Sequence, residues 1–289
     1  MRYYTRTSFL AWLLLCVSSA GNDQGTGPPA DGGNSPRHRI RVLTWNVLAP
    51  SFAERLLGLL FETGSTDRAH ALLREAKGLD PDIVAFQEVT AGFMTVIAED
   101  SGWAGYHASV SGRGEPPGGL LVLSQYPFTK IAYRKLPSPS GRLALFATLD
   151  LGSEPLVVAN VHLESPLENR ATRTAQLEFV NERIPRRGLA VVMGDFNFGD
   201  QDPEGGRLMG WTDAWIRRRP AEAGHTYDLD ANPLARKHAF TAEPSRRLDR
   251  ILTSPQLIPT AAGMAGQVTG RSGPPSDHYG VWADLDQDR

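Results

Sequence analysis

Short runs of β-branched and apolar residues recur from Ile40 almost to the end of the 289-residue chain, and they limit the possible folds more than any other feature. Each run has the length and composition of a buried strand. The runs occupy residues 40–47, 82–89, 119–124, 143–151, 156–163, 189–193, 247–253 and 281–285. Amphipathic spacing predicts helices at about 65–79, 90–100 and 167–184. Helices and strands in this irregular order favour an α/β sandwich of mixed β-sheets flanked by helices.

The first 38 residues lack this pattern. Residues 1–20 carry two arginines, then an apolar run from Phe9 to Val17, then small residues ending at Ala20, which is the layout of a secretory signal peptide. The run is too short to span a bilayer, which needs about 20 residues. Residues 21–38 have no aliphatic side chain larger than Ala and predict a flexible linker. We therefore expect a secreted or periplasmic protein with one folded domain at 39–289.

Cys16 is the single cysteine of the chain and lies inside the expected signal peptide. Cleavage after Ala20 would leave a mature chain without a disulfide. Cleavage just before Cys16 would instead give a lipid-anchored protein, an alternative that the bulky Leu15 disfavours.

The charge of the chain is nearly balanced, with 30 Lys and Arg against 32 Asp and Glu and a formal net charge of −2. Loss of Arg2 and Arg6 with the signal peptide brings the mature chain near −4. Such a chain has no global basic field of the kind that dominates non-specific nucleic-acid binding. A polyanionic substrate would have to be held locally.

Polar side chains stand at the ends of six of the expected strands. Such interruptions of buried strands are costly unless the side chains converge on a partner, so they indicate a site. Oxygen ligands without a mature cysteine suit Mg²⁺ or Mn²⁺ better than structural zinc. Carboxylates drawn together also need a cation or a phosphate-binding cluster to balance their charge. The six blocks are Thr44-Trp45-Asn46, Gln87-Glu88-Val89, Asn160-Val161-His162-Leu163-Glu164, Gly194-Asp195-Phe196-Asn197, Arg247-Leu248-Asp249-Arg250 and Ser276-Asp277-His278.

These blocks, with Ser124-Gln125-Tyr126-Pro127, resemble in their order the endonuclease/exonuclease/phosphatase superfamily, the group of the DNase I-like metal phosphodiesterases. The resemblance extends from Ile40 to Leu285. It is most similar to the 5′-tyrosyl-DNA phosphodiesterases at residues 162–165, at Arg170, Arg173 and Gln176, and later at residues 225–228 and Asn232. It implies a four-layer α/β/β/α sandwich and a Mg²⁺-dependent phosphodiesterase (Mn²⁺ being the alternative ion), with nucleic acid as the leading substrate.

The resemblance also implies roles for individual residues. Asp195 would orient or deprotonate the attacking water, and Asn197 would donate to the oxygen that gains charge. His278, oriented by Asp249, would donate to the phosphate, and His162 would add a second donor. Asn46 and Glu88 would hold the metal with Asp277 beside it, and the expected substrate-binding residues are Arg142, Arg173 and Tyr227.

Several of these assignments have a structural alternative. Arg142 fits an ordinary strand-edge charge equally well, Asp249 fits an ion-pair partner of Arg247 or Arg250, and Tyr227 fits core packing. His238 has no context that indicates a site. For the short charge runs, solvated surface is favoured over a nucleic-acid contact, and the acidic residues after Asn197 fit a solvated loop; they are Arg217-Arg218-Arg219, Arg246-Arg247, Asp200, Asp202 and Glu204.

Two other functions remain open from the sequence. One is a phospholipid or sphingomyelin phosphodiesterase, which an export signal would suit. The other is an exported binding protein that kept the fold and lost the chemistry. No motif implies a protein partner, so we expect a monomer.

Overall fold

The computed structural model describes residues 39–48, 65–152, 154–165, 167–185, 187–239, 243–267 and 273–287. The expected signal peptide at 1–20, the linker at 21–38 and Cys16 lie outside these residues. Among the helices in the described ranges, none is long and apolar enough to cross a membrane.

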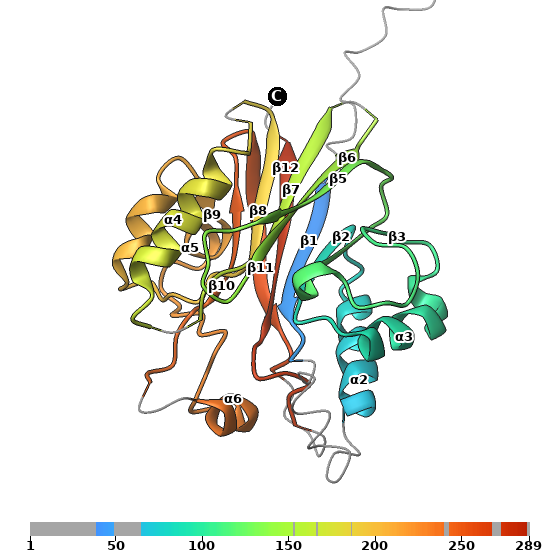
Figure 1. The fold of residues 1–289 in the computed structure, drawn as a ribbon, viewed down its shortest axis with the longest axis horizontal. Coiled ribbons are helices and arrows are strands. Elements are labelled where there is room, and N and C mark those ends of the chain that lie inside the picture. The colour runs from blue at the N-terminus through green and yellow to red at the C-terminus, as the bar shows by residue number, and fades with distance from the viewer. Residues whose placement is uncertain are drawn as a thin grey trace, which may run out of the picture. The chain divides into compact units, whose positions relative to one another are not determined.

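Two six-stranded sheets form the centre of the fold (Figure 1). The first contains, in spatial order, β11 (Leu257–Ala265), β12 (Gly280–Gln287), β1 (Arg39–Asn46), β2 (Ile83–Gln87), β4 (Leu121–Ser124) and β3 (His107–Ala108). The second contains β5 (Phe128–Lys135), β6 (Leu143–Asp150), β7 (Pro155–His162), β8 (Leu189–Asp195), β10 (Asp249–Thr253) and β9 (Thr212–Asp213). Both sheets are mixed, because β1 pairs in parallel with β2 and β7 pairs in parallel with β8, whereas the other pairs are antiparallel.

The largest core cluster lies between the sheets. Val42 and Ile83 of the first sheet and Val158, Val191 and Ile251 of the second belong to it and are buried. Because successive side chains of a strand point to opposite faces, the alternate residues are free to pack against helices. The two sheets therefore form the inner layers of a sandwich.

Helices cover the outer faces (Figure 1). α2 (Ser65–Gly78) and α3 (Ala91–Glu99) pack Leu73 and Phe93 against Trp45 and Phe86 of the first sheet. α4 (Arg170–Asn181) packs Leu177 against the second sheet. The remaining helical segments are η1 (Ser101–Trp103), η2 (Pro117–Gly119), η3 (Pro203–Leu208), α5 (Ala214–Arg218) and α6 (Pro233–His238). The predicted four-layer α/β/β/α architecture is confirmed.

All eight expected strands are present, but the sequence does not reveal four others. β5 reads Phe-Thr-Lys-Ile-Ala-Tyr-Arg-Lys and is an exposed edge strand, where charges are tolerated. β11 is the edge strand of the other sheet and contains Pro259 beside a register shift. β3 and β9 have two residues each. Edge strands bury only part of their surface, so they lack the apolar pattern that identifies central strands.

Candidate active site

The six polar blocks converge because of the strand directions. β1 and β2 run in parallel, and so do β7 and β8, so each pair ends at one common edge. β10 and β12 run antiparallel to their neighbours and therefore begin at that edge. In the second sheet, Asp195 is in register with His162 on one side and with Asp249 on the other. The blocks, which lie between residues 44 and 278, thus meet at one end of the two packed sheets.

Asp195 lies at the centre of the cluster and is buried. Its Oδ2 accepts a hydrogen bond from Asn46 Nδ2 at 3.1 Å and lies 3.5 Å from His162 Nε2 and 3.9 Å from His278 Nε2. Its Oδ1 accepts from the backbone N–H of Asn197 at 2.9 Å. Burial opposes ionisation, but the charge of His278 and these hydrogen bonds outweigh it and hold the pKa of Asp195 below its usual value. Asp195 is therefore a carboxylate at neutral pH.

His278 forms a buried pair with Asp249. The Nδ1 to Oδ2 distance is 2.8 Å, and the imidazole packs against the Tyr227 ring with centroids 5.1 Å apart. Burial alone would lower the pKa of His278, but the carboxylates of Asp249 and Asp195 prevail and raise it well above 6.5. His278 is consequently an imidazolium that presents Nε2–H toward Asp195. Asp249 is the partner of His278 here, and the alternative pairing with Arg247 or Arg250 is not the one the structure shows.

His162 has the opposite protonation state. It is buried, and its Nδ1 lies 3.0 Å from Arg142 Nη1. Burial and the neighbouring guanidinium lower its pKa to about 3, although Asp195 favours the charged form. The cluster therefore contains one charged and one neutral imidazole.

Asn46 and Glu88 form the side of the cluster that belongs to the first sheet. Asn46 Oδ1 accepts from the backbone N–H of Leu48 at 3.1 Å, so Nδ2 faces the carboxylates and donates to Glu88 Oε1 at 3.0 Å. Asn46 Oδ1 accepts this one hydrogen bond and keeps a second lone pair, so the expectation that Asn46 helps to hold a metal stays a prediction. Asn46 also orients Glu88 and Asp195.

Glu88 meets the requirements of a metal-binding carboxylate. Burial, followed by repulsion from Asp277, raises its pKa to about 7. A divalent cation beside Glu88 and Asp277 would remove that repulsion, and carboxylate oxygens are the ligands that Mg²⁺ prefers. The residues present therefore fit the expected ion.

A second grouping of ligand atoms occurs within the described residues. One atom each from Asp195, Asp249 and His278 lie within 4.8 Å of one another. This spacing would suit a metal, but the ring of His278 is protonated and hydrogen-bonded through Nδ1. An imidazolium has no free lone pair, so in this protonation state only the two carboxylates of the group could bind a metal.

His238 joins the site although no local pattern in the sequence marks it. It ends α6, and its Nδ1 lies 3.2 Å from Asp277 Oδ2. Asn232 begins the same helix by accepting from the backbone N–H groups of Leu234 and Ala235, and its Nδ2 donates to the carbonyl of Ser276. An Asn-Pro pair is a recognisable helix start, so α6 itself could have been predicted. Its contact with Asp277 could not.

Backbone conformation sets two of the site residues apart. Glu88 has a φ angle of 60° and Asn197 has a φ angle of 54°. Both lie in the left-handed region that residues other than glycine rarely adopt. Such strain is found where function fixes the direction of a side chain. Gly194, just before Asp195, has φ of 144°, and a Cβ there would lie within 3 Å of the Val161 backbone. The residue before Asp195 has to be glycine.

Two expected substrate-binding residues turn out to be structural. Arg173 is fully buried, pairs with Glu204 at 2.8 Å and donates to the carbonyl of Glu164. Glu204 is also buried, so it does not belong to a solvated loop. Tyr227 is 7% exposed and donates its hydroxyl hydrogen to the Ala235 carbonyl, which leaves no ring face for a base. Tyr227 therefore packs against the imidazole of His278 and helps to fix its position.

The structure also rules out a contact between Arg247 and a nucleic-acid backbone. Arg247 is buried and bound to Asp213 at 2.9 Å and to Asp200 at 2.5 Å, and Arg250 shares Asp200 at 2.7 Å. Arg250 also donates to the carbonyl of Phe198. The network fixes the turn after Asn197 to β10, so Arg247 is not available to a nucleic-acid backbone and Asp200 is not simply solvated.

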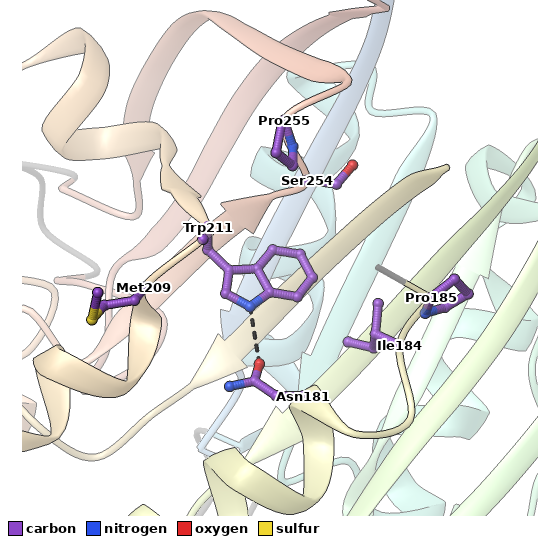
Figure 2. A pocket seen from close by; sticks show the side chains of 8 residues that line it. Asn181, Ile184, Pro185, Met209, Trp211, Ser254 and Pro255 are labelled. Carbon is purple, nitrogen blue, oxygen red and sulfur yellow. Dashed lines mark hydrogen bonds between the residues drawn. The ribbon is translucent and has the colours of Figure 1, made fainter. Parts of the chain in front are cut away.

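A pocket lies away from this cluster. Its volume is about 310 Å³, and Figure 2 shows Trp211 and Met209 in its wall, with the indole nitrogen donating to Asn181 Oδ1 at 2.9 Å. Ser254, which also lines it, follows the end of β10 opposite to Asp249, roughly 17 Å away at about 3.4 Å per residue. The pocket shares no residue with the cluster around Asp195.

Comparison with solved structures shows what the fold is similar to. TDP2 of D. rerio complexed with single strand DNA product superposes with a TM-score of 0.69 at 23% identity, over 86% of this chain and 98% of that chain. Truncated TDP2 of Caenorhabditis elegans gives 0.67 at 23% identity, over 86% and 97%. Sphingomyelinase C from Streptomyces griseocarneus gives 0.63 at 18% identity, over 86% and 99%. At these identities the similarity establishes the fold.

Comparison at the level of sequence identifies the family. No curated protein matches the chain. The family model described as Endonuclease/Exonuclease/phosphatase family matches residues 43–278, which contain all the strand-end blocks. The chain therefore belongs to the endonuclease/exonuclease/phosphatase family.

Proposed function

We propose that this protein hydrolyses phosphodiester bonds with the help of a divalent metal ion, most suitably Mg²⁺. The proposal rests on the environment of Asp195. This residue is an ionised carboxylate that Asn46, His162 and His278 contact from three other strand ends. Membership of the family and the fold shared with TDP2 and sphingomyelinase C support the same reaction class.

The residues divide the work of in-line displacement. Asp195 orients the attacking water and accepts its proton, since its pKa is low enough to keep it ionised. His278 supplies a charged donor to a phosphate oxygen, held in place by Asp249, and Asn197 is placed beside Asp195 to add an amide donor. Asn197 Nδ2 already donates one hydrogen to the Leu163 carbonyl at 3.0 Å, which leaves its second hydrogen for the substrate.

A divalent ion bound at Glu88 and Asp277 would stabilise the negative charge that develops on the phosphate oxygens. The protein's own contribution on this side is to keep both carboxylates oriented. Asn46 holds Glu88 at 3.0 Å, and His238 holds Asp277 at 3.2 Å.

Nucleic acid is the substrate class we propose first. It rests on the likeness of the sequence blocks to the 5′-tyrosyl-DNA phosphodiesterases and on the fold shared with a TDP2 that was solved with a single-stranded DNA product. The fold shared with sphingomyelinase C keeps sphingomyelin as the rival substrate. A panel of 5′-tyrosyl DNA, single- and double-stranded DNA, RNA and sphingomyelin decides between them; turnover of sphingomyelin alone would reject the nucleic-acid assignment.

The reaction class is tested with a bis-aryl phosphodiester in the presence of Mg²⁺ and of EDTA. We expect hydrolysis with Mg²⁺ and none with EDTA. In Glu88→Ala, the hydrolysis that depends on Mg²⁺ should be lost. Asp195→Asn should lower kcat by about 100-fold or more while the protein stays folded. Asp150→Asn is the matched control, because Asp150 is exposed at the opposite end of the second sheet. Folded wild-type protein without metal-dependent turnover of any substrate in the panel would overturn the proposal.

A further inference from the structure

The contact between Arg142 and His162 fixes a proton. Arg142 Nη1 lies 3.0 Å from His162 Nδ1. A guanidinium group has five N–H donors, has no acceptor and keeps its charge in proteins. The imidazole nitrogen must therefore be the acceptor, so Nδ1 carries no hydrogen.

The remaining ring nitrogen then has a defined role. A neutral imidazole with an unprotonated Nδ1 carries its hydrogen on Nε2. That nitrogen lies 3.5 Å from Asp195 Oδ2, the oxygen that His278 Nε2 also faces from 3.9 Å. Both imidazoles thus turn an N–H toward the same oxygen, and the donors differ only in charge.

The groups around His162 act on its charge in both directions, and those that favour the neutral ring prevail. Arg142 approaches from the start of β6 and Asp195 from the end of β8, and His278 and Asp277 act from the loop that enters β12. The burial of the ring and the positive charges of Arg142 and His278 favour the neutral form, against the two carboxylates.

The segment that carries Arg142 is itself anchored. The backbone N–H of Arg142 donates to Ser138 Oγ at 3.2 Å, and the hydroxyls of Ser138 and Ser140 donate to Glu164 Oε2 at 2.5 and 3.1 Å. Glu164 is buried and lies two residues after His162. Residues 138–142 are therefore tied to the chain that carries the imidazole they act on.

We propose that Arg142 is a positioning residue that keeps His162 neutral with its hydrogen on Nε2, so that His162 serves as an uncharged donor beside Asp195. The role in catalysis rests on the proposed phosphodiesterase function, whereas the protonation state does not. With two imidazolium groups beside it, Asp195 would be a poorer base toward water. With one charged and one neutral donor, Asp195 is a stronger base than it would be beside two cations, and the N–H groups of both rings still face it.

The test is the ¹⁵N NMR spectrum of histidine-labelled full-length protein between pH 4.5 and 8.5 without substrate, with His162 assigned by its absence in His162→Gln. We expect a neutral ring with hydrogen on Nε2 at every pH. In Arg142→Met, which removes donor and charge, the ring should become an imidazolium at the acidic end. In Arg142→Lys a cation remains, so the ring should stay neutral. Arg134→Met is the control, since Arg134 is exposed on β5.

Kinetics separate this role from substrate binding. If the protein is a phosphodiesterase, Arg142→Met should lower kcat by about 10- to 100-fold and change KM little, with partial recovery in Arg142→Lys. A wild-type ring with hydrogen on Nδ1, or an unchanged ring in Arg142→Met with only KM raised, would overturn the proposal. Because the spectra need no turnover, they report the protonation state of His162 even if no substrate is hydrolysed.

Discussion

At the scale of single residues, the site depends on how its environment sets protonation. His162 and His278 are both buried and both face Asp195, yet burial beside a guanidinium keeps the first neutral and burial beside two carboxylates keeps the second charged. Residue type alone does not determine what a histidine does here. The charged neighbour on the far side of each ring determines it.

The positive charge of His278 predicts how kcat depends on pH. In Asp249→Asn the charge that raises the pKa of His278 is reduced, so the imidazolium is lost at lower pH. We expect the alkaline limb of the kcat profile to move to lower pH by about one unit or more, with kcat lowered about 100-fold or more. In the wild type, the stabilisation from this pair is complete below pH 6.5 and is lost as pH rises through the raised pKa. Asp150→Asn should leave the profile in place; an unmoved limb in Asp249→Asn would show that another group controls it.

At the scale of elements, buried ion pairs fasten the segments that carry site residues. The Arg173–Glu204 pair joins α4 to η3, and the network of Arg247 and Arg250 joins β10 to the turn after Asn197. These arginines act on structure, and the site depends on them only through position.

The ion pair between α4 and η3 predicts an effect on stability. Arg173→Met leaves the buried Glu204 carboxylate without its partner, which costs about 3–5 kcal/mol in the free energy of unfolding. The double variant Arg173→Met/Glu204→Leu should recover most of that loss, as measured by urea denaturation. The rate per folded molecule should stay within about twofold of wild type, since neither side chain contacts the site. A rise in KM of Arg173→Met without loss of stability would restore the substrate-binding role.

The sequence predicts the central strands and the convergence of polar residues around Asp195 for one reason. Central strands are buried on both faces, so their apolar runs are visible and the polar residues that end them stand out, as Asp195 and His278 do. The roles of Arg173, Tyr227 and His238 depend on partners that are distant in the chain, so the sequence does not predict these roles. Glu204 is 31 residues from Arg173 in the chain, and Asp277 is 39 residues from His238. Such contacts follow from the packing of loops, which no local pattern encodes.

At the scale of the whole molecule, the near-neutral charge makes the site itself responsible for holding a polyanion. The chain has a formal charge of −2, and Arg173, Arg247 and Arg250 are committed to buried ion pairs. The 30 Lys and Arg are balanced by 32 Asp and Glu, so the molecule as a whole has no excess of positive charge with which to release counterions from a nucleic acid.

This balance predicts a weak salt dependence. We expect single-stranded DNA to bind the Asp195→Asn protein with a slope of log affinity against log salt of about −2 to −3, and to lose most affinity in EDTA. Arg217→Gln/Arg218→Gln tests the exposed arginine run and should leave the slope unchanged. Fluorescence anisotropy across a salt series measures it. A slope of about −6 that the double variant flattens would instead place the polyanion on the arginine surface.

The Asp249–His278 pair joins the two sheets, because Asp249 begins a strand of the second and His278 shortly precedes a strand of the first. Its shared hydrogen is buried between atoms 2.8 Å apart. Movement of one sheet against the other would change this distance, together with the distance between Asn46 and Asp195. The proton NMR resonance of that hydrogen therefore reports the alignment of the two sheets. It can be followed during heating, metal binding or turnover without an added label.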